Sequence, residues 1–440
     1  MCFAVELLPS RLRHYSYVYF LKNVFWSLFG ALLLRSQIII VSIFIGRILM
    51  ISEFGKLGLL RSTIGTFTIF ASVGVGLGAT KFISEAIAFE NHNIFSWVKF
   101  SYTVTFYSAG FFGIITYLIA DDVGKSLLND SHFGNYIKLS ALLIFLNCIL
   151  STQIGILNGF QSFRRIAVLN MYGSILAISL QFYFTWLYHI NGFILASSFS
   201  CVIQAGLNHF VIRSFLKQSA SIVKNKLSKS LKKAFLNFCV PAALSGLMVT
   251  PVSWYCNTIL VKGQNGFKEM AFFDIANNWR MILIFIPSTI SQVVLPNITA
   301  INNRLKLRNF LYFNMLLNGC IALVSCALLL FLTIPLLKLY GDQFITGQFT
   351  FKILIISSIF LAIGNVIAQL IAGKLKMWYG FAVNIIWAIA IILLSIYFIE
   401  HQKMGAEGLA WAYLISYFIH TILQLFIFFI YFNNTKSINA

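Results

Sequence analysis

The segment from Trp378 to Ile399, WYGFAVNIIWAIAIILLSIYFI, contains no charged side chain. An α-helix of about 20 residues crosses the roughly 30 Å hydrocarbon core of a bilayer, so this segment predicts a transmembrane helix. Comparable apolar runs recur along the 440 residues, of which 59% are hydrophobic and 10% are charged. Charged residues make up about 25% of an ordinary soluble domain. The chain is therefore predicted to be an integral membrane protein.

The apolar runs do not alternate with a period of two, so they indicate helices rather than the strands of a β-barrel. The short break at 188–192 leaves open whether the spans beside it form one long helix. We expect an all-α polytopic protein with about twelve spans, at residues 24–46, 57–78, 97–119, 138–158, 167–188, 192–212, 236–261, 271–296, 310–337, 350–372, 378–399 and 406–432.

A weak internal repeat divides these spans into two halves. Glu53-Phe54-Gly55 aligns with Glu269-Met270-Ala271 at an offset of 216, and Gly159 aligns with Gly373 at an offset of 214. Related halves are typical of transporters, with the substrate bound between them. The expected domains are a cytoplasmic segment at 1–22, a lobe of six spans at 23–212, a basic cytoplasmic linker at 213–235, a second lobe at 236–432 and a cytoplasmic tail at 433–440.

The distribution of basic residues predicts the orientation in the membrane, because basic loops stay in the cytoplasm. With both termini inside, the cytoplasmic loops receive Arg164, Arg165 and Arg304, together with the seven basic residues from Arg213 to Lys233. Most acids then lie outside. The net charge of +20 is explained by cationic loops facing anionic lipid, so nucleic acid is not expected as a partner.

The sequence offers no chemistry for an enzyme, a metal or another cofactor. The seven cysteines form no C-x-x-C pair and have no histidine at ligand spacing. Every predicted outer loop is short, whereas membrane polysaccharide polymerases and ligases need large outer loops with catalytic groups. The start, Met1 to Ser10, lacks the features of a cleaved signal peptide. We therefore expect a transporter without a cofactor.

Among the ionisable side chains inside predicted spans, three arginines and one aspartate are the candidates for a polar site, namely Arg35, Arg61, Asp274 and Arg280. Each costs roughly 2.5 to 3.5 kcal/mol at a span centre unless it faces a cavity or a partner. Arg35 lies about 16 Å into its span at roughly 1.5 Å per residue, and Gln37 follows it. These residues are therefore candidates for a polar site.

The span at 271–296 carries a polar face, which a helix facing lipid would lack. Its members are Asp274, Asn277, Arg280, Ser288, Ser291 and Gln292. In the preceding span, Ser253 and Asn257 share a face, and two prolines, Pro241 and Pro251, favour bends. Structural interpretations remain open: Arg61 could snorkel to the interface, and Arg280 could simply pair with Asp274. Asp274 could equally exchange a proton or Na⁺.

Three segments resemble polysaccharide-export flippases of the MOP (multidrug, oligosaccharidyl-lipid and polysaccharide) exporter superfamily. The stretch RILMISEFG at Arg47 to Gly55, with the Gly76-Leu77-Gly78 that follows, resembles the first two spans of these flippases. The stretch ILNGFQSFRR at Ile156 to Arg165 resembles their loop between spans 4 and 5, and residues 241–276 are similar to their spans 7 and 8. In this order the segments resemble the Wzx type in particular.

The resemblance implies a MATE/MOP-like pair of lobes in the bacterial inner membrane. It implies alternating access that translocates an undecaprenyl-diphosphate-linked oligosaccharide, such as an O-antigen unit for lipopolysaccharide biosynthesis. Besides this lipid-linked oligosaccharide and membrane lipids, it implies a polysaccharide polymerase and a chain-length regulator as candidate partners. One departure is Asn257, because many members of the family carry an acidic residue near that position.

On this interpretation the arginines bind the diphosphate, since a guanidinium fork matches phosphate oxygens. The predicted substrate-binding residues are Arg35, Arg61, Arg280, Asn277 and Gln37; the predicted coupling or structural residues are Asp274 and Asn257. Two alternatives remain, an exporter of cationic drugs from the same superfamily and a membrane polysaccharide polymerase or ligase. A drug exporter would usually offer carboxylates, and here the cations outnumber the single embedded acid.

Overall fold

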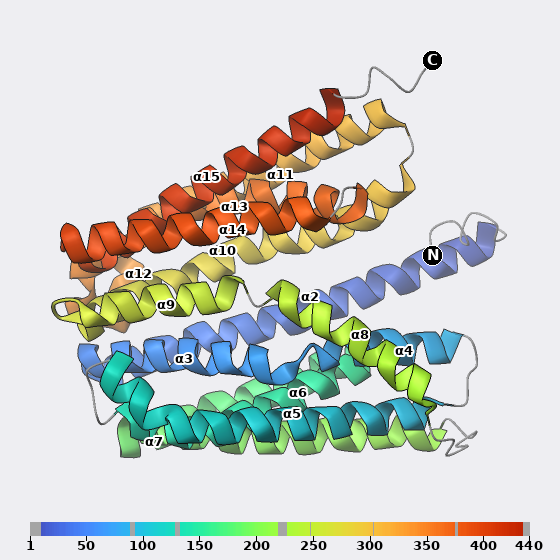
Figure 1. Cartoon of the computed structure of the whole chain (residues 1–440), viewed down its shortest axis with the longest axis horizontal. Coiled ribbons are helices and arrows are strands. Elements are labelled where there is room, and N and C mark those ends of the chain that lie inside the picture. The colour runs from blue at the N-terminus through green and yellow to red at the C-terminus, as the bar shows by residue number, and fades with distance from the viewer. Residues whose placement is uncertain are drawn as a thin grey trace. The chain divides into compact units, whose positions relative to one another are not determined.

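The computed structural model describes residues 10–88, 93–127, 133–218, 227–246, 248–301, 303–374 and 377–433. Within these ranges all regular elements are helices, as the sequence predicts, and Figure 1 shows their course along the chain. The contacts divide the chain into two compact units. Unit 1 comprises Met1–Val41, Phe67–Leu118 and Lys138–Leu244, and unit 2 comprises Ser42–Thr66, Ile119–Ile137 and Ser245–Ala440.

The first half of the chain supplies α2 to α7. Their bounds are Ser10–Ile48 (α2), Ile51–Ser72 (α3), Val75–Ala88 (α4), Ile94–Asp122 (α5), Phe133–Gly159 (α6) and Phe163–Gln218 (α7), with a π-helix at Val123–Leu127. The second half supplies α8 to α15. Their bounds are Lys229–Gly246 (α8), Val249–Lys262 (α9), Gly266–Ala300 (α10), Arg304–Phe331 (α11), Thr333–Tyr340 (α12), Gln348–Lys374 (α13), Met377–Ile396 (α14) and Gly405–Asn433 (α15).

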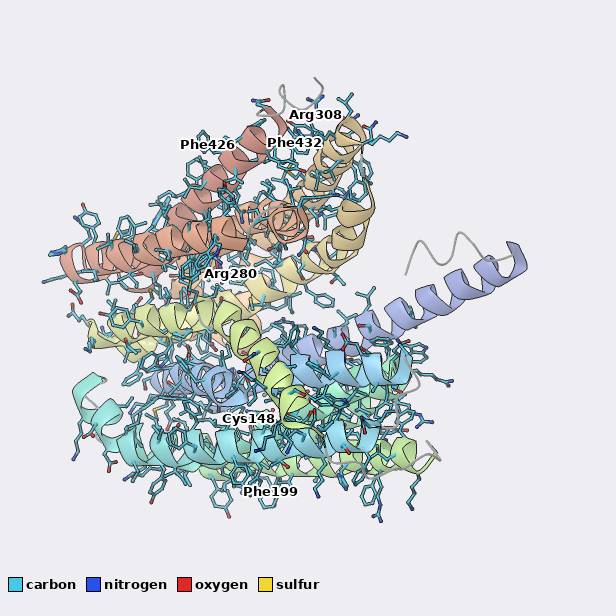
Figure 2. The ribbon with its side chains drawn as sticks, turned by 45° about the vertical axis from the view of Figure 1, so that its right-hand side comes forward. Cys148, Phe199, Arg280, Arg308, Phe426 and Phe432 are labelled. Carbon is cyan, nitrogen blue, oxygen red and sulfur yellow. The ribbon has the colours of Figure 1, made fainter. Side chains whose placement is uncertain are left out.

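Eight of the described helices are long and apolar enough to cross a membrane, or up to nine if each bent pair counts as one span. The long α7 holds two legs, and α10 and the α8/α9 pair supply the remaining predicted spans. A twelve-helix membrane protein is consistent with these elements. Side chains such as Phe199, 53% exposed, and Phe426, 63% exposed, point outward from their helices, as expected where the surrounding medium is lipid (Figure 2).

The span predicted at 57–78 is wrong as a single helix. Helices α3 and α4 meet at a bend of 45°, where Val73 and Gly74 have φ angles of 47° and 66°. Such left-handed backbone ends a helix, and it suits the glycine far better than the β-branched valine. The hydropathy of this stretch is continuous, so hydropathy alone could not reveal the break.

The two spans predicted around residues 188–192 are confirmed, and the alternative of one long helix is wrong. Non-helical backbone at Tyr188 and His189 interrupts α7. The two legs of α7 fold back on each other, and Gln181 Nε2 of the first leg donates a hydrogen bond to Ser197 Oγ of the second at 2.9 Å. A Cβ atom on Gly192 would overlap the carbonyl of Phe184, so this tight return requires glycine.

The segment Ser42–Thr66 packs with the second half of the chain inside unit 2. Arg47 Nε donates to the Leu339 carbonyl at 2.7 Å, and the Phe54 ring lies edge-on against Tyr340 and Phe344, with centroids 6.2 and 5.6 Å away. All three rings are fully buried. Aromatic pairs of this geometry stabilise a fold beyond the area that they bury.

The repeat at an offset of 216 has a direct structural counterpart in unit 2. The position of a Cβ on Gly55 would be 3.1 Å from the amide nitrogen of Ala271, and that on Gly58 would be 2.9 Å from Cβ of Asp274. Both pairs are separated by the repeat offset, so equivalent positions of α3 and α10 touch. Such self-contacts are expected where two related elements meet at a symmetry axis.

Candidate polar site in unit 2

Glycines bring α3 and α10 into backbone contact at one end of the site. A Cβ at Gly55 would overlap the carbonyl oxygen of Phe267, and one at Gly58 would press on the side chain of Asp274. About two turns further along α3, a Cβ at Gly65 would meet no atom within 4 Å. The helices therefore touch near Gly55 and leave open space beside Gly65, and Arg61 lies between these two positions.

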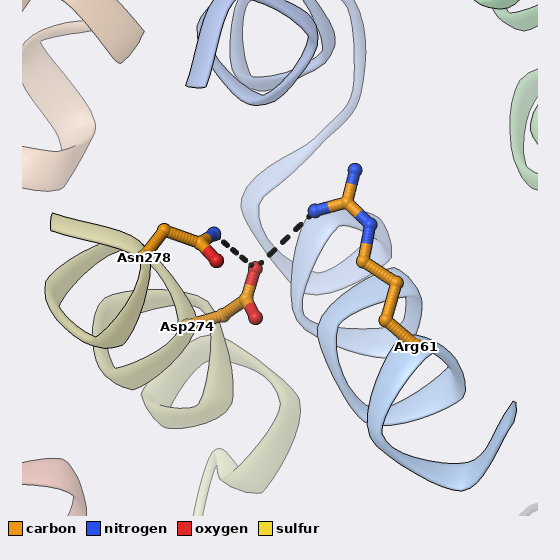
Figure 3. A network of polar contacts seen from close by, with 3 residues as sticks. All are labelled: Arg61, Asp274 and Asn278. Atoms are coloured by element: carbon orange, nitrogen blue, oxygen red, sulfur yellow. Dashed lines mark hydrogen bonds and ion pairs between the residues drawn. The ribbon is translucent and has the colours of Figure 1, made fainter. Parts of the chain in front are cut away.

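Arg61 and Asp274 form an ion pair between α3 and α10 (Figure 3). Nη1 of Arg61 lies 3.5 Å from Oδ2 of Asp274, and the two side chains are 23% and 10% exposed. The amide of Asn278 donates to the same carboxylate oxygen at 3.2 Å. The pair is longer than the 2.7 to 2.9 Å of a tight charge-assisted bond. Asp274 is thus held by one cation and one amide, and its charge opposes that of Arg61.

Helix α9 contacts the same stretch of α3 through two side-chain hydrogen bonds. Asn257 Nδ2 donates to Ser62 Oγ at 3.0 Å, and Trp254 Nε1 donates to Thr63 Oγ1 at 3.0 Å. The carbonyl oxygen of the buried Asn257 side chain has no partner within the described residues. Together with the ion pair, these bonds join three helices of unit 2 over a single turn of α3.

Arg280 is the most enclosed cation of the site. Only 5% of it is exposed, and its guanidinium carbon lies 4.8 Å from the ring centroid of Tyr413 and 5.5 Å from that of Tyr417. Nη2 donates to Asn277 Oδ1 at 2.9 Å. Two further nitrogens, Nε and Nη1, are buried without a hydrogen-bond partner in the described part of the chain. Figure 2 locates Arg280 within the helices of unit 2.

Burying a guanidinium without a counter-charge is costly, by several kcal/mol, unless other groups take the place of water. The two tyrosine rings offset part of this cost through cation–π contacts, worth about 0.5 to 2 kcal/mol each. They leave the donors at Nε and Nη1 unused. Such an arrangement suits an anion with several oxygens, because the guanidinium fork can bind two of them at once.

The structure corrects one interpretation made from the sequence. Asp274 is paired with Arg61 and not with Arg280, so a simple Arg280–Asp274 pair is wrong. Their separation of six residues on α10 places the two side chains more than a full turn apart, and α3 supplies the nearer cation. The side chain of Arg61 turns toward Asp274, and 23% of it is exposed.

Five of the seven predicted site residues fall in unit 2. They are Arg61, Asn257, Asp274, Asn277 and Arg280. The other two, Arg35 and Gln37, are half-buried on α2 in unit 1. Of the polar face predicted on α10, Asp274 and Arg280 are buried and Ser288 is half-buried; Ser291 and Gln292 lie outside the residues whose side chains are described.

Sequence reasoning missed the tyrosines that hold Arg280 and the α3 hydroxyls that bind α9. The sequence analysis does not single out Tyr413 and Tyr417, although their four-residue spacing puts both rings on one face of α15. That spacing was the available signal. Ser62 and Thr63 follow Arg61 directly, and nothing in the sequence indicates which helix they meet.

Known structures of transporters share this fold. The chain superposes on an inward-facing multidrug resistance MATE family transporter of the MOP superfamily with a TM-score of 0.79 and 16% identity, over 92% of this chain and 96% of that one. A MOP superfamily transporter from Pyrococcus furiosus superposes with a TM-score of 0.69 and 15% identity, over 94% and 95%. The fold is therefore that of the MATE/MOP transporters, as the sequence predicts.

A family model described as polysaccharide biosynthesis protein matches residues 20–302. The chain belongs to this family of polysaccharide biosynthesis proteins. A curated relative is the EPS I polysaccharide export inner membrane protein EpsE of Ralstonia solanacearum, 23% identical over 184 residues, which are 40% of this chain and 41% of that protein. The alignment thus spans about two fifths of the relative's length.

Proposed function

We propose that the protein is a flippase that carries a lipid-linked oligosaccharide across the bacterial inner membrane by alternating access. The substrate class is an undecaprenyl-diphosphate-linked repeat unit of a surface polysaccharide. Support comes from the family and from the fold of transporters. A relative whose printed name describes polysaccharide export at the inner membrane adds to it. On this proposal the chain performs no covalent chemistry.

The observation that carries the proposal is the state of Arg280. Its buried Nε and Nη1 donors have no protein partner among the described residues, and its charge faces no carboxylate there. A diphosphate supplies both missing features, several acceptor oxygens and negative charge. Asn277 would orient the guanidinium through its 2.9 Å bond, and the tyrosine rings would hold it in place.

The remaining predicted residues take secondary parts in the proposal. Arg61 already faces Asp274, so its charge contributes less to an anion than that of Arg280 does. Asp274 and Asn257 act mainly by positioning α3, through the bonds to Arg61 and Ser62. Arg35 and Gln37 remain candidate contacts of the substrate in unit 1. A polysaccharide polymerase and a chain-length regulator remain candidate partners.

The rival within transport is export of a cationic drug, which the fold also allows. The charges of the site argue against it, because a drug cation would meet two arginines and one carboxylate that is already paired. A polymerase or ligase needs a catalytic constellation. Such enzymes also need a large outer loop, and every outer loop predicted from the sequence is short.

The test is translocation of a fluorescent undecaprenyl-diphosphate oligosaccharide in proteoliposomes, measured as label protected from an external quencher. We expect protection with the wild type and an initial rate lower by about ten- to a hundredfold with Arg280→Ala, since a charge-assisted contact is worth about 1.5 to 3 kcal/mol. The matched control is Arg304→Ala, because Arg304 also lies over a ring, 5.7 Å from Tyr431, but is exposed.

The outcomes separate the candidates. Equal rates for wild type and Arg280→Ala would keep a flippase but reject Arg280 as the diphosphate contact. Transport of a cationic dye without any protection of the lipid-linked sugar would assign the protein to drug export. Polymer formed from the same substrate would assign it to the polymerases.

A further inference from the structure

Unit 1 differs from unit 2 in charge. The described residues of unit 1 contain one acid, Glu85, and many cations. Nine of these cations lie on α4, α5, α7 and α8, namely Lys81, Lys99, Arg164, Arg165, Arg213, Lys217, Lys229, Lys232 and Lys233. Lys81 lies in the middle of α4, and the other eight lie within the first or last two turns of α5, α7 and α8. These four helices share one hydrophobic core cluster, which includes Ile83, Trp97, Ile212 and Phe235. Cations of four helices therefore lie near this core cluster.

Three helices converge on Phe235 in this core cluster. The fully buried ring of Phe235 on α8 lies 5.4 Å from Phe82 of α4, 5.8 Å from Trp97 of α5 and 5.4 Å from Phe100 of α5. A Cβ on Gly78 of α4 would press on both Phe235 and Cys239. The first turns of α8 are thus fixed against α4 and α5 by tight aromatic packing.

Two exposed lysines lie over aromatic rings of neighbouring helices. The ammonium of Lys81 on α4 is 4.4 Å from the ring centroid of Phe238 on α8. The ammonium of Lys232 on α8 is 5.6 Å from that of Phe100 on α5. Lys81, Phe82, Phe100, Lys232 and Phe238 form what we call the basic-aromatic surface. The rings restrict where the two ammonium groups lie, and the exposed lysines keep donors available to other partners.

The start of α8 has the pattern of a helix at a membrane surface. Lys229, Lys232 and Lys233 are exposed, while Phe235 and Cys239 are fully buried and Leu236 is 38% exposed. Exposed lysines beside aromatic rings are typical of side chains that reach from hydrocarbon toward phosphates. Basic helices of this kind bind anionic lipid surfaces.

We propose that the basic-aromatic surface is a docking site for the phosphate groups of anionic phospholipids. The two cations of this surface are lysines, and this favours phospholipid as the partner. A lysine ammonium is a compact, strongly hydrated charge that can bind many phosphates without a fixed geometry. Arg280, in contrast, offers a buried guanidinium fork suited to a single defined anion. Lipid bound here anchors the first turns of α8 at the bilayer surface. This inference is independent of the flippase proposal.

The experiment is native mass spectrometry of the full chain in detergent, with phosphatidylglycerol or phosphatidylcholine added at equal concentrations. We expect the wild type to retain phosphatidylglycerol preferentially. The double variant Lys81→Gln/Lys232→Gln should bind it roughly fivefold more weakly for each lysine removed, the equivalent of about 1 kcal/mol per basic residue. The charge-conserving variant Lys81→Arg/Lys232→Arg should bind it like the wild type.

The matched control is Lys268→Gln/Lys352→Gln. These lysines also lie over rings, 5.9 Å from Phe272 and 5.6 Å from Phe349, but they belong to unit 2. Unchanged retention in the control would support a local site. Equal binding of the two lipids by the wild type, or an equal loss in the control, would overturn the proposal. Stronger binding of farnesyl diphosphate than of phosphatidylglycerol at the same lysines would also overturn it, and would assign the surface to an isoprenyl diphosphate.

Discussion

Oδ2 of Asp274 on α10 lies 3.5 Å from Nη1 of Arg61 on α3, and the two residues are 213 positions apart in the chain. The contact sits beside the pair Gly58 and Asp274, whose separation equals the offset of the internal repeat. The ion pair therefore joins two equivalent helices of a duplicated architecture. This ion pair also distinguishes the two arginines: Arg61 faces the carboxylate of Asp274, and Arg280 faces no carboxylate among the described residues.

Removing one partner of this ion pair should harm the protein more than removing both. Asp274→Leu leaves Arg61 mostly buried without its carboxylate, and Arg61→Met leaves Asp274 without its cation; breaking a buried pair in this way costs about 3 to 5 kcal/mol. The double variant Arg61→Met/Asp274→Leu replaces the pair with apolar groups and should recover more than half of the loss. Thermal unfolding in detergent, analysed as a double-mutant cycle, measures both effects. An additive double variant would show that the 3.5 Å contact contributes no coupling.

Gly55 should tolerate no side chain, whereas Gly65 should. Gly55→Ala places a methyl group on the Phe267 carbonyl, so α3 and α10 must separate. Gly65→Ala meets open space and should raise the stability by about 0.5 to 1 kcal/mol through helix propensity. Yield of monodisperse protein and the melting temperature in detergent provide the comparison. Equal behaviour of the two variants would contradict the close packing at Gly55.

The ring of Tyr413, and not its hydroxyl, should support Arg280. Tyr413→Phe keeps a ring 4.8 Å from the guanidinium and is expected to transport within about twofold of the wild type, because the cation–π contact is retained. Tyr413→Leu removes the ring and should lower the rate about tenfold. The proteoliposome assay measures these rates. The control is Tyr312→Leu, because Tyr312 lies on α11 and its ring contacts Phe428. A larger loss for Tyr413→Phe than for Tyr413→Leu would contradict the role of the ring.

The bond between Asn257 and Ser62 should couple α9 to α3. Each of the changes Asn257→Ala and Ser62→Ala removes the same 3.0 Å hydrogen bond, so each is expected to destabilise the protein by about 1 kcal/mol. Together they should cost little more than either alone. A double-mutant cycle on melting temperature tests this. Fully additive losses would mean that the two side chains act separately.

Labelling of single cysteines tests the expected orientation. In a chain with its own cysteines replaced, Gln343→Cys should react with a membrane-impermeant maleimide in intact cells. Leu305→Cys should react only after the cells are made permeable, because basic residues of its loop keep it in the cytoplasm. Both positions are exposed in the structure. The reverse pattern would place both termini outside and invert every loop assignment.

The arrangement of the spans was largely predictable, and the local breaks were not. Long apolar runs specify helices wherever water is absent, because each helix must satisfy its own backbone hydrogen bonds. The bend at Val73 and Gly74 escaped prediction because an apolar run has the same hydropathy whether it is straight or bent. The return at Tyr188 and His189 was visible only as a short break.

Five of the seven predicted site residues lie in unit 2, and the sequence did not predict how they pair. Burial of charge is costly in lipid, so Arg61, Asp274 and Arg280 stand out in a sequence that is only 10% charged. Which cation meets Asp274 depends on the approach of α3 to α10 through Gly55 and Gly58. The role of Tyr413 likewise depends on how α15 packs against α10, since its spacing from Tyr417 puts two rings on one face but does not identify the cation that they meet.

The sequence by itself determined that this protein is a helical membrane protein built from two related halves with cations inside its spans. Hydropathy, charge and repeat offset are properties of the chain alone, and the bilayer converts them directly into structure. Only the tertiary structure decided that Asp274 neutralises Arg61 and that Arg280 retains two buried donors. Pairing depends on distances of a few ångströms between helices far apart in sequence, and those distances are set by packing.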